Sequence, residues 1–105
     1  MEKFIMIITT TETEEEAEKI AEIVVSEKLA ACVQIIPSIK SVYRWQGKVE
    51  KSKEQLLFIK TKTELFEKVE KAIKENHSYE VPEIVAVPIN NGSKEYFEWI
   101  ENVTL

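Results

Sequence analysis

Two residue types with metal-binding or nucleophilic chemistry occur once each in the chain, at Cys32 and His77. A thiolate suits soft or borderline ions such as Cu(I) and Zn(II), and an imidazole nitrogen binds Cu(II) or Zn(II). Structural zinc needs about four ligands, so one histidine forms at most a weak site that borrows oxygens from Glu80 or Glu83. Cys32 and His77 could also act as a catalytic nucleophile and its base, but the sequence shows no third residue that would orient the base.

Both residues also have a structural interpretation. Cys32 lies within Ala-Ala-Cys-Val, at the entry to an apolar strand, where a small buried residue is expected. His77 lies at the predicted end of a helix, where a polar residue commonly terminates the helix and the dipole favours a protonated imidazole. The sequence therefore predicts a core position for Cys32, and either a helix terminator or a weak metal ligand at His77.

A second group of residues predicts a cleft for a small molecule. The aromatic residues Tyr43, Trp45 and Tyr79 favour either packing between subunits or the wall of a pocket between subunits. Lys60 follows an apolar run, so its ammonium group is expected at the end of a strand. There it would form an ion pair or, if it lies in a cleft, bind an anionic small molecule. The predicted cleft residues are Tyr43, Trp45, Glu50, Lys60, Tyr79 and Glu83.

The hydrophobic pattern predicts the elements that must position these residues. Apolar β-branched runs predict strands, and apolar residues recurring at intervals of three and four predict amphipathic helices. Thr11 and Glu14 have the spacing of a capping box, Ser93 caps a last helix, and Pro37 predicts a bulge or an edge. The expected strands cover residues 4–9, 31–36, 39–45, 49–61 and 83–88, and the expected helices cover 13–29, 64–76 and a short segment after residue 93.

This order predicts an α+β fold of the ferredoxin-like β-α-β-β-α-β type, followed by a short helix, in one domain over residues 1–105. Both helices are expected on one face of the sheet, with the other face open. Residues 32–46 would span about 50 Å if extended, whereas a domain of this size is about 30–35 Å wide. A ribbon that overhangs is marginal in water, so the sequence predicts an oligomer in which another subunit pairs with it.

The composition excludes several classes of function. The formal net charge is −5, all 19 acidic residues are Glu, and Arg44 is the single Arg among 14 basic residues. A negative chain without a basic block binds nucleic acid poorly, and two glycines leave no glycine-rich phosphate loop. The apolar run at residues 4–8 is too short for a signal peptide or a membrane span. The sequence predicts a cytoplasmic protein with no nucleic-acid or membrane partner.

Several stretches follow one another along almost the whole chain: residues 27–33, 41–50, 57–61 and 77–83, with Tyr96 and Trp99 in the last helix. Together they resemble the CutA family of divalent-cation tolerance proteins. The resemblance implies a ferredoxin-like subunit in a tight homotrimer, with long hairpins paired between subunits, that binds divalent cations, copper foremost, without catalysis. The family is similar in architecture to the trimeric PII signalling proteins, which gives two alternatives: a regulatory trimer with a small ligand between subunits, or a stable scaffold whose metal binding is incidental.

The resemblance is incomplete at the positions associated with copper. Some members of the family carry a Cys in the first strand and a pair of histidines before the Tyr of the fourth stretch. Here Thr9 and Asn76 occupy two of these positions, and Ser78 replaces the usual Pro. The resemblance therefore implies His77 as the metal ligand and weak binding of Cu(II) or another divalent cation.

Overall fold

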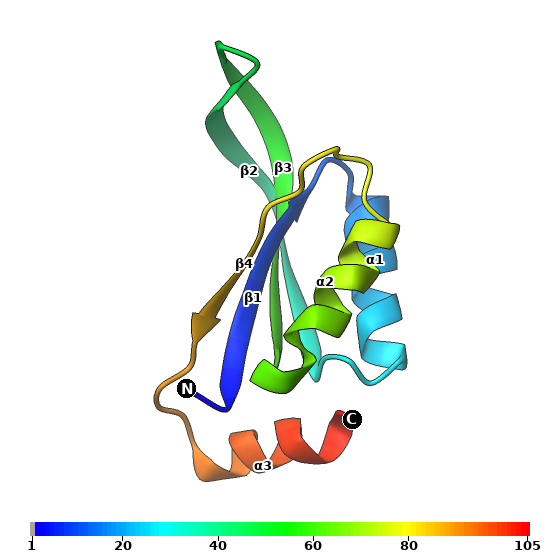
Figure 1. The fold of residues 1–105 in the computed structure, drawn as a ribbon, viewed down its shortest axis with the longest axis vertical. Helices are drawn as coiled ribbons and strands as arrows, with labels where there is room; N and C mark the ends of the chain where they lie inside the picture. The colour runs from blue at the N-terminus through cyan, green and yellow to red at the C-terminus, as the bar shows by residue number, and fades with distance from the viewer. Residues whose placement is uncertain (1) are drawn as a thin grey trace.

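Four strands and three α-helices follow one another in the predicted order (Figure 1) in a computed structural model that describes residues 2–105. The prediction of an α+β fold is confirmed. The elements are β1 (Phe4–Thr11), α1 (Glu14–Ser26), β2 (Cys32–Trp45), β3 (Lys48–Lys62), a 3-10 turn (Thr63–Leu65), α2 (Phe66–Glu75), β4 (Ile84–Pro88) and α3 (Lys94–Val103).

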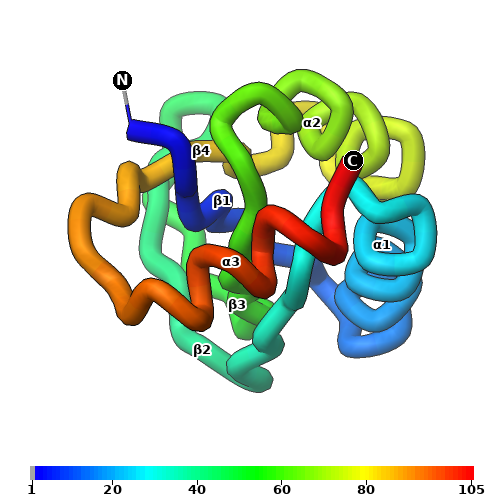
Figure 2. The backbone as a smooth tube through the Cα atoms, turned by 90° about the horizontal axis from the view of Figure 1, so that it is seen from below, coloured from blue at the N-terminus to red at the C-terminus, as the bar shows by residue number. Residues whose placement is uncertain are grey.

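The four strands form an antiparallel sheet in the order β2-β3-β1-β4, with β2 and β4 at its edges. Helices α1 and α2 lie side by side on one face (Figure 1, Figure 2), as the sequence predicts. Alternate residues of β1 and β3, such as Ile7 and Ile59, point to these helices and are fully buried. The core under the helices also contains Ala17, Ile20, Val24, Leu57, Val69 and Ile73.

The opposite face of the sheet, called the open face below, is apolar and is not covered by α1 or α2. Val85 and Val87 of the edge strand β4 lie opposite Ile8 and Met6 of β1 on this face. Val85 is 47% exposed, and Ile36 of β2 is exposed as well. The sequence prediction of an uncovered face is thus confirmed for the single subunit.

The hairpin of β2 and β3 projects beyond the rest of the molecule, which measures 44 × 25 × 22 Å (Figure 1). Its projecting part, residues 39–54, is called the arm below. The register shifts between Ile36 and Ile39, where Ser38 has a φ of 59°, so the bulge predicted at Pro37 is confirmed. At the tip, Gln46 and Gly47 have φ values of 49° and 80°, as a two-residue turn of type I′ requires.

The start of α1 differs from the sequence prediction. Thr13, not Thr11, is the N-cap, and its side chain accepts a hydrogen bond of 3.1 Å from the Glu16 amide. Thr11 instead ends β1, opposite Gln55, because its β-branched side chain also suits a strand. The spacing Thr-x-x-Glu occurs three times in this tract, from Thr9, Thr11 and Thr13, so the capping-box pattern alone did not select the cap.

The other helix ends shift by a few residues. Helix α1 ends at Ser26, earlier than predicted, because Lys28 adopts a left-handed φ of 60° that stops the helix. Helix α2 begins at Phe66, after a tighter 3-10 turn. The cap predicted at Ser93 is confirmed by a 3.2 Å hydrogen bond from the Tyr96 amide. Helix α3 lies across the end of the sheet where β1 begins and β3 ends (Figure 2).

Candidate functional site

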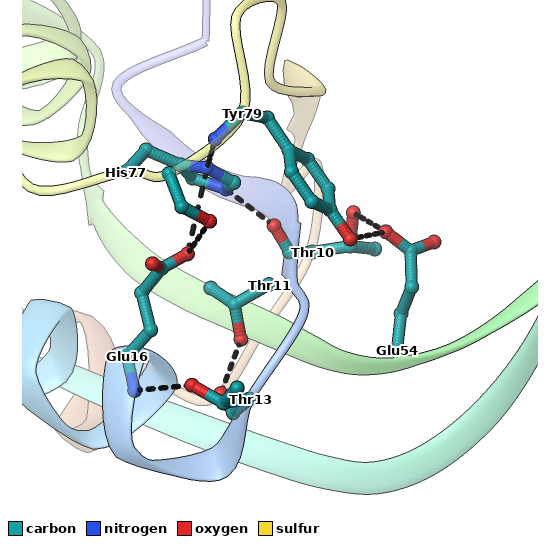
Figure 3. A network of polar contacts seen from close by, with 8 residues as sticks. Thr10, Thr11, Thr13, Glu16, Glu54, His77 and Tyr79 are labelled. Atoms are coloured by element: carbon teal, nitrogen blue, oxygen red, sulfur yellow. Dashed lines mark hydrogen bonds and ion pairs between the residues drawn. The ribbon is translucent and has the colours of Figure 1, made fainter. Parts of the chain in front are cut away.

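His77 lies in the segment that follows α2 and passes over the end of β1 (Figure 3). Its side chain is fully buried. Nε2 lies 2.6 Å from the carbonyl oxygen of Thr10, and Nδ1 accepts a 3.0 Å hydrogen bond from the amide of Tyr79. A neutral imidazole has one donor and one acceptor nitrogen, so these bonds assign the proton to Nε2. Both nitrogens of His77 are therefore in use.

The same segment is tied to the first turn of α1. The carboxylate of Glu16 accepts a 3.3 Å hydrogen bond from the Ser78 hydroxyl, and it lies 3.5 Å from Nδ1 of His77. Glu16 thus bonds with its backbone to Thr13 and faces the 77–79 segment with its side chain (Figure 3). These contacts fix the path of residues 77–79 relative to β1 and α1.

Tyr79, Thr10 and Glu54 form a second cluster beside His77 (Figure 3). Oε2 of Glu54 accepts two hydrogen bonds, at 2.8 Å from the Tyr79 hydroxyl and at 3.1 Å from the Thr10 hydroxyl. Burial, together with the hydrogen bond to the Glu54 carboxylate, raises the pKa of Tyr79 well above its ordinary value. The phenol therefore stays protonated and acts as a donor.

A cavity of about 640 Å³ opens beside this cluster, between the arm and residues 78–83. Tyr43 and Glu50 are opposite each other in the hairpin register, so both side chains stand on the same face of the arm. Five of the six residues predicted for a cleft line this cavity. The full lining consists of Thr10, Ser41, Val42, Tyr43, Trp45, Glu50, Glu54, Ser78, Tyr79, Glu80, Val81 and Glu83.

Lys60, the sixth predicted cleft residue, lies elsewhere in the subunit. It is on the same strand as Glu50 but about 33 Å further along, at about 3.3 Å per residue. Its Nζ lies 5.5 Å from the ring centroid of Tyr96 in α3. Within one subunit, Lys60 therefore cannot share a cleft with Tyr79 and Trp45, and the anionic ligand inferred from it has no cationic partner in the cavity.

Cys32 is also not where the sequence places it. It pairs with Lys60 on the open face and is only partly buried, whereas its neighbour Val33 faces the helices opposite Ile59. Its Sγ lies 3.5 Å from the Tyr96 hydroxyl. Burial and the contact with Cys32 raise the pKa of Tyr96 to about 12. The predicted core position is wrong because the alternation of β2 puts Cys32 on the uncovered face.

The residues considered for a metal do not fit one. Among residues 2–105, no three His, Cys, Asp or Glu side chains are grouped so that they could hold a metal ion. His77 has both nitrogens engaged, Asn76 donates its amide to the Ala72 carbonyl at 2.8 Å, and Thr9 is fully buried. A Cu(II) or Zn(II) ion would have to break these hydrogen bonds before His77 could act as a ligand.

Three residues of the site were missed from the sequence: Thr10, Glu16 and Glu54. Thr10 belongs to a threonine-rich tract, Glu16 to an acidic first helical turn, and Glu54 to the charged stretch before an apolar strand. Each has an ordinary local explanation. Their roles come from partners that lie 25 to 67 positions away in the chain, so no local pattern indicates them.

Comparisons with known proteins agree with this geometry. The family model described as CutA1 divalent ion tolerance protein matches residues 5–103. Protein CutA, chloroplastic, from Arabidopsis thaliana is 47% identical over 100 residues, which cover 95% of this chain and 55% of that protein. This chain thus spans about half of that relative's length.

Solved structures of similar proteins have nearly the same backbone. The divalent cation tolerance protein (Cut A1) from Thermus thermophilus aligns with a TM-score of 0.94 at 46% identity, over 96% of this chain and 98% of that one. The periplasmic divalent cation tolerance protein CutA from Archaeoglobus fulgidus aligns with a TM-score of 0.93 at 43% identity, over 95% of this chain and 97% of that one.

These names correct one prediction and identify the family. A cytoplasmic location is contradicted, because the Arabidopsis relative is described as chloroplastic and the Archaeoglobus relative as periplasmic. Within residues 2–105, every helix is too short or too polar to cross a bilayer. The family model covers most of the chain, and its relatives carry the same fold. The chain belongs to the family of CutA1 divalent ion tolerance proteins, which is named for a role in metal tolerance.

Proposed function

We propose that this chain acts in divalent-cation tolerance as a non-catalytic homotrimer of ferredoxin-like subunits. The main support for the proposed assembly is the open face, where Ile36, Val85 and Val87 form an exposed apolar surface that α1 and α2 do not cover. Monomeric soluble proteins rarely expose large apolar patches. A neighbouring subunit that covers this face would bury it.

The arm supports the same proposal. It is a two-stranded ribbon whose exposed residues include Val42 and Val49, of which Val42 is 60% exposed. A ribbon without a third strand is marginally stable in water, and its free edge exposes unpaired backbone groups. Pairing with neighbouring subunits would remove both problems.

The assembly is tested by static light scattering on the wild type and on a double variant, Val42→Glu with Trp45→Glu. The wild type is expected at three times the subunit mass of 12.2 kDa. The double variant is expected as monomers or aggregates, because it places two carboxylates on the arm. The matched control, Lys68→Glu with Lys71→Glu on the exposed side of α2, should keep the wild-type mass. An unchanged mass in the arm variant would contradict the proposal.

For the cation itself, we propose weak binding of Cu(II) or another divalent ion by surface carboxylates rather than by His77. The support is that both His77 nitrogens are engaged and that the chain has 19 glutamates. Calorimetric titration of Cu(II) and Zn(II) into the wild type and His77→Ala should give the same weak heats. Saturable binding near one ion per subunit, lost in the variant at unchanged mass, would instead identify His77 as a ligand.

The proposal that the protein is non-catalytic rests on where the two nucleophile and base candidates lie. Cys32 contacts Tyr96 beside the start of β1, and His77 contacts the backbone of Thr10 at the end of β1. The length of the sheet separates them, so they do not form a thiolate–imidazole pair in one subunit. No other pair of nucleophile and base was indicated by the sequence.

A second candidate function is regulation by a small ligand in the cavity. It is favoured by one observation: the arm and residues 78–83 bring Tyr43, Trp45, Glu50, Tyr79 and Glu83 to the same cavity. A volume of about 640 Å³ is within the usual range for small-molecule sites. A ligand-induced rise in Tm that Glu54→Gln abolishes would support this function. If neither metal nor ligand binds and the trimer persists, a scaffold role would replace both candidates.

A further inference from the structure

The cavity between the arm and residues 78–83 has a distinctive charge. Its lining includes four glutamates, and among the described residues that line it there is no Lys, Arg or His. At short range and in a partly enclosed space, four carboxylates repel an anion and attract a cation. The cavity of the single subunit is therefore unsuited to an anionic ligand. The four carboxylates belong to Glu50, Glu54, Glu80 and Glu83.

Glu54 gives this charge a fixed position. The residue is only 7% exposed, and its Oε2 accepts the hydrogen bonds from both Tyr79 and Thr10. Within residues 2–105, the other oxygen, Oε1, accepts no hydrogen bond, and Figure 3 shows it on the side away from the Tyr79 and Thr10 hydroxyls. A carboxylate oxygen without a partner, in a partly enclosed space, gains from a charged donor. An N–H of a ligand would supply that donor.

The remaining walls of the cavity are aromatic and apolar. Tyr43, Trp45 and Tyr79 contribute rings, and Val81 adds an aliphatic residue. An aromatic face attracts a cation, and rings and an aliphatic residue suit a short hydrocarbon chain. A bare metal ion would gain nothing from contact with an aliphatic residue.

We propose that the cavity binds a small organic cation, in which an ammonium group faces Glu54 and a short apolar chain lies along the aromatic wall. The proposal rests on the second candidate function, ligand binding by this cavity, and names the class of the ligand. It assigns the anchoring role to Glu54, with Glu50 and Glu83 adding to the negative potential at the mouth.

Three probes with the same five-carbon chain test the class of ligand: n-pentylammonium, 1-pentanol and pentanoate. Calorimetric titration of the wild type should give saturable binding of pentylammonium. Its Kd should be lower by at least about tenfold than that of pentanol, with weaker binding still for pentanoate. Raising the salt concentration should weaken pentylammonium binding, because the attraction is electrostatic.

Two isosteric variants test the anchor. Glu54→Gln should weaken pentylammonium binding by about tenfold, and Glu50→Gln, which lies outside the buried cluster, by a smaller factor. The matched control Glu22→Gln, on the exposed side of α1, should leave the Kd unchanged. If circular dichroism shows that Glu54→Gln is unfolded, Glu50→Gln combined with Glu83→Gln provides the test instead.

The outcomes separate this proposal from the functions on which it rests. Equal or tighter binding of pentanoate or pentanol would overturn the organic-cation class while keeping the cavity as a ligand site. Binding that none of the glutamate variants alters would also overturn the proposal. Absence of binding by all three probes would overturn the proposal, whereas a rise in Tm with a ligand of another class, abolished by Glu54→Gln, would keep the second candidate function. Light scattering on the same samples reports the trimer separately, so a failure of assembly would be recognised as such.

Discussion

The two ends of the sheet hold polar clusters of opposite character. Where β1 ends, buried or partly buried groups are carboxylate, phenol and imidazole, centred on Glu54, Tyr79 and His77. Where β1 begins, ammonium groups dominate, because Lys60 and Lys62 lie two positions apart on the same face of β3. Strand β3 thus carries Glu54 near one end of the sheet and Lys60 and Lys62 near the other, too far apart to form an ion pair with each other.

The two ends also differ in what their contacts achieve. Lys62 is buried and bonds to the Leu105 carbonyl, and it lies 3.6 Å from both Glu64 and Glu101. A hydrogen bond from Lys3, with Lys62 nearby, holds the pKa of Glu101 below its ordinary range. These contacts fasten the chain after α3 to the sheet. The opposite end instead borders the cavity, which Glu54 and Tyr79 line.

The largest effect is expected from His77→Ala at the cavity end. The variant removes the partners of the Tyr79 amide and the Thr10 carbonyl together, so the free energy of unfolding should fall by about 3 kcal/mol. Urea unfolding measures the change. His77→Gln, which can restore one of the two bonds, should lose less. A loss in His77→Ala no greater than that of Ser78→Ala would mean that the imidazole is not a structural support.

The next effect is expected from Lys62→Met at the other end. Methionine keeps the apolar length of the side chain but loses the ammonium and its bonds, so stability should fall by about 2 kcal/mol. The nearby Lys60→Met is the matched control, since Lys60 contacts the face of Tyr96, and it should lose less than about 1 kcal/mol. Equal losses in urea unfolding would remove the distinction between the two lysines.

Two tyrosines, one at each end of the sheet, allow a comparison of the ends by pH. Both have a pKa raised above the ordinary value of about 10, so the folded state keeps a proton that the unfolded chain releases. The contribution of these tyrosines to the stability of the folded state is complete below about pH 10. It is lost as the pH rises through the pKa in the folded state, which is about 12 for Tyr96.

Unfolding of the wild type should therefore become easier above pH 10, at the alkaline side of the ordinary tyrosine pKa. Tyr96→Phe and Tyr79→Phe should each flatten this dependence and cost about 1 kcal/mol at neutral pH through a lost hydrogen bond. Urea unfolding at pH 7 and in alkaline buffers measures both. Tyr43→Phe, at a more exposed phenol, is the control. An alkaline loss that persists in the double variant would assign it to other groups.

The smallest effect is expected between the two ends, at Thr9 of β1. Thr9 is fully buried, and within residues 2–105 its hydroxyl has no hydrogen-bond partner. Thr9→Val should therefore raise stability by about 0.5 kcal/mol. The same change at Thr61, whose hydroxyl donates to the Leu29 carbonyl at 2.6 Å, should lower it by about 1 kcal/mol. A loss at both positions in thermal or urea unfolding would show that the Thr9 hydroxyl is satisfied.

Much of the architecture could be predicted because it depends on short-range patterns. The apolar run of β1, the break at Pro37 and the cap at Ser93 each act within a few residues. The capping tract before α1 was the exception, since three threonines have the same spacing to a glutamate. The candidate site was predicted mainly in its aromatic part, because Tyr43 and Trp45 are conspicuous on an arm for which the sequence predicts pairing with another subunit.

By itself, the sequence determined the order of the strands and helices, the overhanging hairpin and the apolar face that α1 and α2 leave open. These follow from periodicity and chain length, which are properties of neighbouring residues. Only the tertiary structure decided that Lys60 and Tyr79 lie at opposite ends, that His77 uses both nitrogens, and that the cavity is acidic. These facts depend on which strands become neighbours and on their register, so they bring together residues that no local pattern connects.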